Sequence, residues 1–231
     1  MRGRADIHFS VEKKFYDSIA KLPWNHPISE WEFLDQNIIN LKRGVSRHLV
    51  IFVKSNGYEF AIKEISAHTA KKEIANYEEI LKRGVHTLLP VGFVMREDDP
   101  FEIDLPMGKQ YEKNETSHTI TLIANRVLPD STLFGRKFQD QNLCKIYDAI
   151  VELFVDLHSN NIFWGDASLA NMLIRFDKEE LPSGKKITKL RAILADAETV
   201  EIFENISDSM RKADIDFFLE SMQWVNDLAF P

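Results

Sequence analysis

The sequence predicts an α+β protein with two lobes: a β-rich N-terminal lobe with one main helix, and a short, mainly helical C-terminal lobe. Two observations support this fold class. Runs rich in β-branched and aromatic residues gather in the first half of the chain, whereas segments with helical periodicity dominate the second half. Polar motifs stand near the junction, so the cleft between the lobes is where a ligand is expected.

The chain is expected to divide into a helical extension, an N-terminal lobe and a C-terminal lobe, at residues 1–37, 38–126 and 127–231. The extension is inferred from the stretch VEKKFYDSIAKL, whose apolar residues recur with helical spacing before Pro23 and Pro27 interrupt the pattern. Two nearby tryptophans are expected to pack the extension against the rest of the protein.

Five strands and one helix are expected in the N-terminal lobe. Three β-rich runs between residues 37 and 65 predict an antiparallel meander, in which Asn56-Gly57 forms the tight turn of a hairpin. The following stretch, SAHTAKKEIANYEEILKRGV, predicts a helix that stops at Gly84. Two further strands are expected in TLLPVGFVMRE and HTITLIANRVL.

The C-terminal lobe is expected to begin with a long helix from about Asp140 to His158. Two short strands, in NMLIRF and KLRAILADAE, follow this helix and are joined by a basic tip that contains Lys185 and Lys186. A last helix is expected to start near Ser207.

Composition excludes several classes of protein. The net charge of −7 disfavours a nucleic-acid partner, which needs clustered excess base. Charged residues interrupt every apolar run, so no transmembrane segment is expected, and without a secretory signal the expected location is the cytoplasm. The single cysteine, Cys144, cannot form an internal disulfide and is expected to be a small buried side chain, and no histidine or cysteine pair has zinc-ligand spacing.

Polar residues of four kinds follow one another along these elements. They are Lys63 in FAIKEI, Glu73 in the next helix, Asp166 and Asn171 in WGDASLANMLIR, and Asp196 in ILADAE. The spacing from Asp166 to Asn171 is enough for a loop to turn and enter the next strand with both side chains facing one cleft. Each residue alone has an ordinary structural explanation, but the order and the element types together do not.

This order resembles the protein-kinase-like superfamily, whose members carry a lysine on the third strand, a glutamate on the following helix, an Asp-x-x-x-x-Asn loop and a later metal-binding aspartate. The resemblance covers nearly the whole chain. The stretches RGVSRHLVIFV, WGDASLANMLIR and LADAETVEI are similar to a bacterial group of uncharacterised kinase-like proteins, sometimes described as lipopolysaccharide-kinase-like. That similarity implies a fold and a nucleotide site, without a substrate.

The resemblance implies ATP and Mg²⁺ as cofactors and assigns a role to each motif residue. Lys63 would hold the α- and β-phosphates and Glu73 would fix its direction, with Glu78 or Glu79 as alternatives. Asp166 would accept or orient the proton of the acceptor hydroxyl.

The metal and the adenine have their own implied positions. Asn171 and Asp196 would supply hard oxygen ligands to magnesium, with Glu198 as a further candidate. Residues from Asn125 to Val127 would form the hinge that binds adenine.

Three motifs depart from the superfamily pattern. The phosphate loop has one glycine, Gly44, so Ser46, Arg47 and His48 are candidates to contact phosphate through their side chains. The stretch DAE replaces Asp-Phe-Gly at the metal site, so no switch driven by a phenylalanine is expected there.

The third departure is in the catalytic loop, where Trp164 and Gly165 replace the usual histidine and arginine. Without that arginine, activity is expected not to depend on a phosphorylated activation segment. Asp214 matches the residue that braces this loop through backbone hydrogen bonds, and His158 is expected to orient the loop as well.

The leading hypothesis is an ATP- and magnesium-dependent phosphotransferase that moves the γ-phosphate of ATP to a hydroxyl group. The acceptor is unknown: a protein, a sugar and a lipid-linked saccharide all fit the same residues. The alternative is a pseudokinase-like nucleotide-binding module that acts through protein partners, which the glycine-poor phosphate loop and the short C-terminal lobe favour. The sequence does not predict an oligomeric state.

Overall fold

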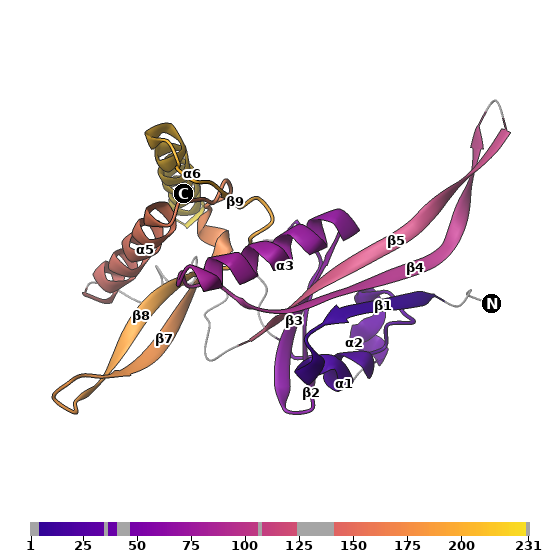
Figure 1. Cartoon of the computed structure of the whole chain (residues 1–231), viewed down its shortest axis with the longest axis horizontal. Helices are drawn as coiled ribbons and strands as arrows, with labels where there is room; N and C mark the ends of the chain where they lie inside the picture. The colour runs from indigo at the N-terminus through magenta and orange to yellow at the C-terminus, as the bar shows by residue number, and fades with distance from the viewer. Residues whose placement is uncertain (1–4, 35–36, 41–46, 106–107, 124–140, 230–231) are drawn as a thin grey trace. The chain divides into compact units, whose positions relative to one another are not determined.

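The computed structural model describes most of the chain, as two units (Figure 1). The described residues are 5–34, 37–40, 47–105, 108–123 and 141–229. The first unit contains the residues up to 40, together with 47–74 and 90–123, and the second unit contains 75–89 and the residues from 141 onward. Among the described residues, no helix is both long enough and apolar enough to cross a membrane.

The first unit is built on a five-stranded antiparallel sheet with the order β1-β4-β5-β3-β2. Its strands are β1 (Asp6–Val11), β2 (Val50–Ser55), β3 (Tyr58–Ile65), β4 (Leu89–Leu105) and β5 (Gly108–Leu122). The predicted hairpin between β2 and β3 is confirmed, with positive φ angles of 49° at Asn56 and 83° at Gly57. Positive φ at both central positions is the geometry that favours an Asn-Gly pair in a two-residue turn.

The edge strand β1 was not expected from the sequence, because the extension was interpreted as helical throughout. Ile7, Phe9 and Val11 alternate with polar residues, which is a strand pattern, and they pack against the hydrophobic core of the unit. The first run of the expected meander is not a strand within the described residues: Ile38 forms only an isolated bridge with Val53.

The rest of the extension covers one face of the sheet. It contains η1 (Lys13–Phe15), α1 (Tyr16–Ala20), η2 (Ile28–Glu30) and α2 (Trp31–Leu34). Trp24 and Trp31 are buried and meet edge to face, with ring centroids 4.9 Å apart. Their indole N–H groups donate to the carbonyl oxygens of Ile19 at 2.7 Å and of His26 at 3.0 Å, so the apolar rings are buried without an unpaired polar atom.

Strand β3 shows why the sheet has two different faces. Phe60 and Ile62 belong to the core under the extension, whereas Lys63, the next residue, contacts Glu73 of helix α3 (Ala67–Lys82). Successive side chains of a strand point to opposite faces, so residues that pack under the extension alternate along β3 with residues on the same face as Lys63. Gly84, with a φ of 77°, follows the helix where the sequence predicted its stop.

The second unit contains the predicted long helix α5 (Gln141–Ser159) and last helix α6 (Asp208–Ala229). Between them lie β6 (Ile162–Phe163), η4 (Leu169–Asn171), β7 (Met172–Glu180), β8 (Lys186–Leu194) and β9 (Glu201–Ile202). Helix α5 buries Ile146, Ile150, Leu153 and Leu157, which recur along it with helical spacing. The expectation that Cys144 is buried is wrong: it lies on the exposed side of α5.

The hairpin of β7 and β8 carries the basic tip as predicted. Near its base, Arg175 donates to both carboxylate oxygens of Asp177, at 2.6 and 2.8 Å, and these bonds hold the pKa of Asp177 below its usual range. At the tip, Lys185 and Lys186 are exposed. The positive charge of the tip therefore faces solvent.

The indole of Trp31 tests whether the extension is part of the core of the first unit. Trp31 is fully buried (0% exposed), so Trp31→Ala should lower the free energy of unfolding by about 3 to 5 kcal/mol in urea denaturation. Phe33→Ala, two residues along the same short helix, is the matched control. Phe33 is 87% exposed, and its replacement should change stability by less than about 0.5 kcal/mol. Equal effects of the two changes would contradict this packing.

Candidate functional site

Within the first unit, Lys63 and Glu73 form a buried ion pair. The Nζ atom of Lys63 lies 3.0 Å from Oε1 of Glu73, and the side chains are 13% and 1% exposed. Glu78 is exposed, and Glu79 pairs instead with Lys82 and Arg83 on its own helix. Of the three candidate glutamates, the structure therefore pairs Glu73 with Lys63.

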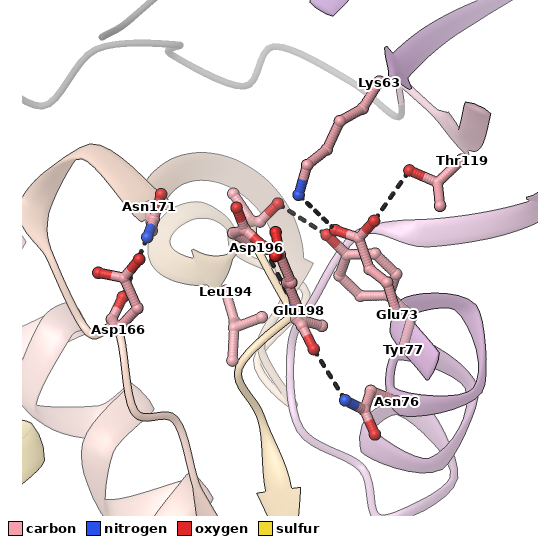
Figure 2. A network of polar contacts seen from close by, with 12 residues as sticks. Lys63, Glu73, Asn76, Tyr77, Thr119, Asp166, Asn171, Leu194, Asp196 and Glu198 are labelled. Carbon is pink, nitrogen blue, oxygen red and sulfur yellow. Dashed lines mark hydrogen bonds and ion pairs between the residues drawn. The ribbon is translucent and has the colours of Figure 1, made fainter. Parts of the chain in front are cut away.

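The second carboxylate oxygen of Glu73 also has a partner, which the sequence analysis missed. The hydroxyl of Thr119, on β5, donates to Oε2 of Glu73 at 2.9 Å (Figure 2). Thr119 is the register neighbour of Lys63 across the β3–β5 pair, so both side chains lie on the same face of the sheet. Strand pairing is non-local, so neither strand alone indicates this contact.

Within the second unit, Asp166 and Asn171 share one tight loop. The side-chain amide of Asn171 donates to the backbone carbonyl of Asp166 at 3.0 Å, and the backbone N–H of Ser168 donates to the same carbonyl at 2.8 Å. The carbonyl of Asn171 in turn accepts from the N–H of Ala195 at 2.9 Å. The loop is therefore closed on itself and tied to the residue before Asp196.

Asp214 braces this loop from α6, as predicted. One carboxylate oxygen accepts from the backbone N–H of Gly165 at 2.9 Å. The other accepts from the N–H of Trp164 at 3.0 Å and lies 3.0 Å from Nε2 of His158. Asp214 is 1% exposed, so these bonds replace the water that a carboxylate would otherwise bind.

The backbone geometry at position 165 explains why glycine rather than arginine stands there. Its φ is 79°, and a Cβ atom there would lie 3.2 Å from the carbonyl oxygen of Thr199. Both the backbone conformation and the close approach favour glycine. The N–H that binds Asp214 is therefore presented by a residue that no larger side chain would easily replace.

The loop around Asp196 is held by donors from helix α3 and from the loop that contains Trp164 and Asp166. The indole N–H of Trp164 donates to the carbonyl of Asp196 at 2.9 Å, and the hydroxyl of Thr199 donates to the carbonyl of Trp164 at 2.8 Å. Trp164 is fully buried, so these contacts fix how the two loops lie against each other.

Two residues of α3 that belong to the second unit also donate hydrogen bonds to the loop around Asp196. The hydroxyl of Tyr77 donates to the carbonyl of Ala195 at 2.7 Å. The amide of Asn76 donates to the carbonyls of Ala197, at 2.8 Å, and Val200, at 3.0 Å (Figure 2). Side-chain donors therefore occupy four carbonyls of the loop at positions 195, 196, 197 and 200.

Oxygen atoms that suit magnesium lie in the same loops. Asp196 and Asn171 are half-buried, and Oδ1 of Asp196 accepts the backbone N–H of Glu198 at 3.1 Å. Carboxylate and amide oxygens are hard ligands of the kind that Mg²⁺ prefers. Among the described residues, no group of three or more His, Cys, Asp or Glu side chains gathers as a protein-only metal centre. The side chains of Asp196 and Asn171 therefore have oxygen atoms of the kind that could hold Mg²⁺.

Several expected site residues lie outside the described part of the chain. They are Gly44, Ser46, Asn125 and Val127. Arg47, from the same expected phosphate loop, is described and exposed. The expected roles of these residues in binding phosphate and adenine remain predictions.

Comparison with known proteins identifies the class of fold. No protein-family model and no curated protein matches the chain significantly. Among solved structures, the chain is similar to WaaP in complex with acyl carrier protein, with a TM-score of 0.55 and 15% identity over 94% of this chain and 80% of that one. It is also similar to the Rio2 kinase from Chaetomium thermophilum, with a TM-score of 0.50 and 14% identity over 82% of this chain and 56% of that one.

The chain therefore has the protein-kinase-like fold, and the fold class predicted from the sequence is confirmed.

Replacing Asp214 tests how much its hydrogen bonds to Trp164 and Gly165 contribute to stability. Asp214→Asn removes the charge and turns one acceptor oxygen into a donor that faces backbone N–H groups, so the free energy of unfolding should fall by about 2 to 4 kcal/mol. Urea denaturation followed by tryptophan fluorescence measures the change.

The control for this substitution is Asp216→Asn on the same helix. Asp216 is partly exposed and pairs with Lys212 at the surface, so the loss should be below about 1 kcal/mol. A similar loss for both variants would show that the buried hydrogen bonds of Asp214 contribute no more to stability than the surface ion pair of Asp216.

Proposed function

We propose that the protein is an ATP- and magnesium-dependent phosphotransferase that transfers the γ-phosphate of ATP to a hydroxyl acceptor. The observation that carries this proposal is the buried Lys63–Glu73 pair, in a chain whose second unit also has a braced loop with Asp166 and Asn171. Phosphoryl transfer needs positioning and charge neutralisation more than covalent chemistry, and these residue types supply both.

Each residue would have one task in the reaction. Lys63 binds oxygens of the α- and β-phosphates, and Glu73 keeps the ammonium group directed at them. Asn171 and Asp196 hold magnesium, which when bound neutralises charge on the phosphate oxygens. Arg47, together with Gly44 and Ser46, is proposed to contact phosphate, and the segment from Asn125 to Val127 is proposed to bind adenine.

The chemical step needs a base for the acceptor. The acceptor oxygen attacks the γ-phosphorus, the bond from that phosphorus to the β–γ bridging oxygen breaks, and ADP leaves. Asp166 accepts the proton of the attacking hydroxyl. Its loop is held by Asn171 and, through Gly165 and Trp164, by Asp214, so its position does not depend on a phosphorylated segment.

The chemical class of the hydroxyl acceptor determines which kind of phosphotransferase the protein would be. A protein, a sugar and a lipid-linked saccharide all present a hydroxyl group. A protein partner is a further possibility to test, since the WaaP structure with a similar fold contains acyl carrier protein. The competing function is a nucleotide-binding module without transfer activity, and it predicts binding of ATP without a phosphorylated product.

Thermal unfolding with magnesium-ATP is the first test of the nucleotide site. At about 100 times the dissociation constant, bound ligand adds roughly 2.7 kcal/mol, which should raise the midpoint by about 5 to 10 °C for a chain of this size. Asp196→Asn should reduce the shift, because it removes a charged metal ligand, and leaving out magnesium should do the same. Asp208→Asn, a matched change at an exposed position of α6, should keep the full shift.

No shift at millimolar nucleotide in the wild-type protein would overturn the proposed function and the nucleotide-binding alternative together. An equal shift in wild type and Asp196→Asn would show that nucleotide binds without the metal role assigned to Asp196.

Transfer is tested with Asp166→Asn. The rate of phosphorylated product from radiolabelled ATP, on a library of protein and saccharide acceptors or on the protein itself, should fall by about 10²- to 10⁴-fold, because the amide cannot accept the proton. Binding of magnesium-ATP should be kept. Wild-type turnover in this variant would show that Asp166 is not the base, and binding without any product in the wild type would favour the nucleotide-binding module.

A further inference from the structure

We propose that Thr119 is a positioning residue for the nucleotide site, and that its hydroxyl holds the carboxylate of Glu73 in the orientation that pairs with Lys63. This inference rests on the proposed function, because it concerns how Lys63 is held for phosphate. Within the first unit, the side chains of Thr119 and Lys63 each bond to Glu73, one to each carboxylate oxygen (Figure 2).

Burial makes the orientation of this carboxylate important. Glu73 is 1% exposed and Thr119 is 2% exposed, so water does not take the place of a lost partner. A buried carboxylate oxygen without a donor is costly, and the carboxylate would rotate or shift to find one. Removing the Thr119 hydroxyl would therefore change how this carboxylate is held and, with it, the direction of the Lys63 ammonium group, which the proposed reaction needs for phosphate.

Thr119 is suited to this task by its place in the sheet. It is paired in register with Lys63 on the neighbouring strand, so the backbone sets the separation of the two side chains. A β-branched side chain has few χ1 rotamers, so the hydroxyl direction is restricted before any ligand binds. Glu73 is therefore fixed from the sheet, through β5, as well as by its own helix.

The strand that carries Lys63 and the strand beside it both hold Glu73. The positioning is a property of the first unit alone, since all three residues belong to it.

The test compares Thr119→Val, which keeps the shape and removes the hydroxyl, with Thr119→Ser, which keeps the hydroxyl. The probe is a non-hydrolysable ATP analogue with magnesium, and the dissociation constant is measured by isothermal titration calorimetry. We expect Thr119→Val to weaken binding roughly 5- to 30-fold, the factor that corresponds to about 1 to 2 kcal/mol, and Thr119→Ser to bind within about twofold of the wild type.

The control for loss of any buried threonine hydroxyl is Thr87→Val. Thr87 is also 2% exposed, and its hydroxyl donates to the carbonyl of Leu194 at 2.7 Å in the second unit. This variant should lose stability in urea to a similar degree as Thr119→Val, while its affinity for the analogue stays unchanged. If Thr119→Val does not fold, Thr119→Ala takes its place, because it also lacks the hydroxyl.

A double-mutant cycle shows whether Thr119 acts through Glu73. In a Glu73→Gln background, Thr119→Val should have little further effect on the dissociation constant. The same fold-loss in both backgrounds would overturn the inference, since Thr119 would then affect the ligand by another route.

The remaining outcomes separate this inference from the proposed function. If the wild type binds the analogue and Thr119→Val binds equally well, the positioning role is wrong and the proposed function stands. If the wild type does not bind the analogue at all, the proposed function fails and takes the inference with it.

Discussion

A carboxylate that is buried from water must have its oxygens satisfied by the protein, and two such carboxylates organise the two units of this chain. In the first unit, Glu73 is held by Lys63 and Thr119. In the second, Asp214 is held by two backbone N–H groups and by His158. Each carboxylate gathers groups from distant parts of the sequence, so each determines where a functional loop or strand lies.

The bracing from Asp214 explains how the loop that contains Asp166 keeps its structure with Trp164 and Gly165 in place of the usual histidine and arginine. Glycine and tryptophan at positions 165 and 164 present the backbone N–H groups that Asp214 binds. The tryptophan ring adds a donor for the carbonyl of Asp196. The loop that contains Asp166 is therefore bonded directly to the loop that contains Asp196.

The loop from Ala195 to Val200 is also held by hydrogen bonds to its backbone. Tyr77, Asn76 and Trp164 supply side-chain donors to its carbonyls, so a change in its backbone would leave several buried acceptors without partners. A loop whose carbonyls are bonded to helix and loop side chains has one strongly favoured conformation.

The sequence by itself determined the features that depend on local patterns. Helical periodicity predicts α3 and α5, the Asn56-Gly57 pair predicts the hairpin of β2 and β3, and the spacing from Asp166 to Asn171 predicts a shared loop. The order of the motifs was sufficient to predict the kinase-like fold, since order along the chain is independent of how side chains pack.

Only the tertiary structure decided which side chains meet across the fold. It selected Glu73 over Glu78 and Glu79, because the choice depends on which helix face lies against β3. It paired Thr119 with Glu73, placed β1 at the sheet edge and left Cys144 exposed. Each of these outcomes rests on contacts between residues far apart in sequence, and local periodicity does not encode the partner.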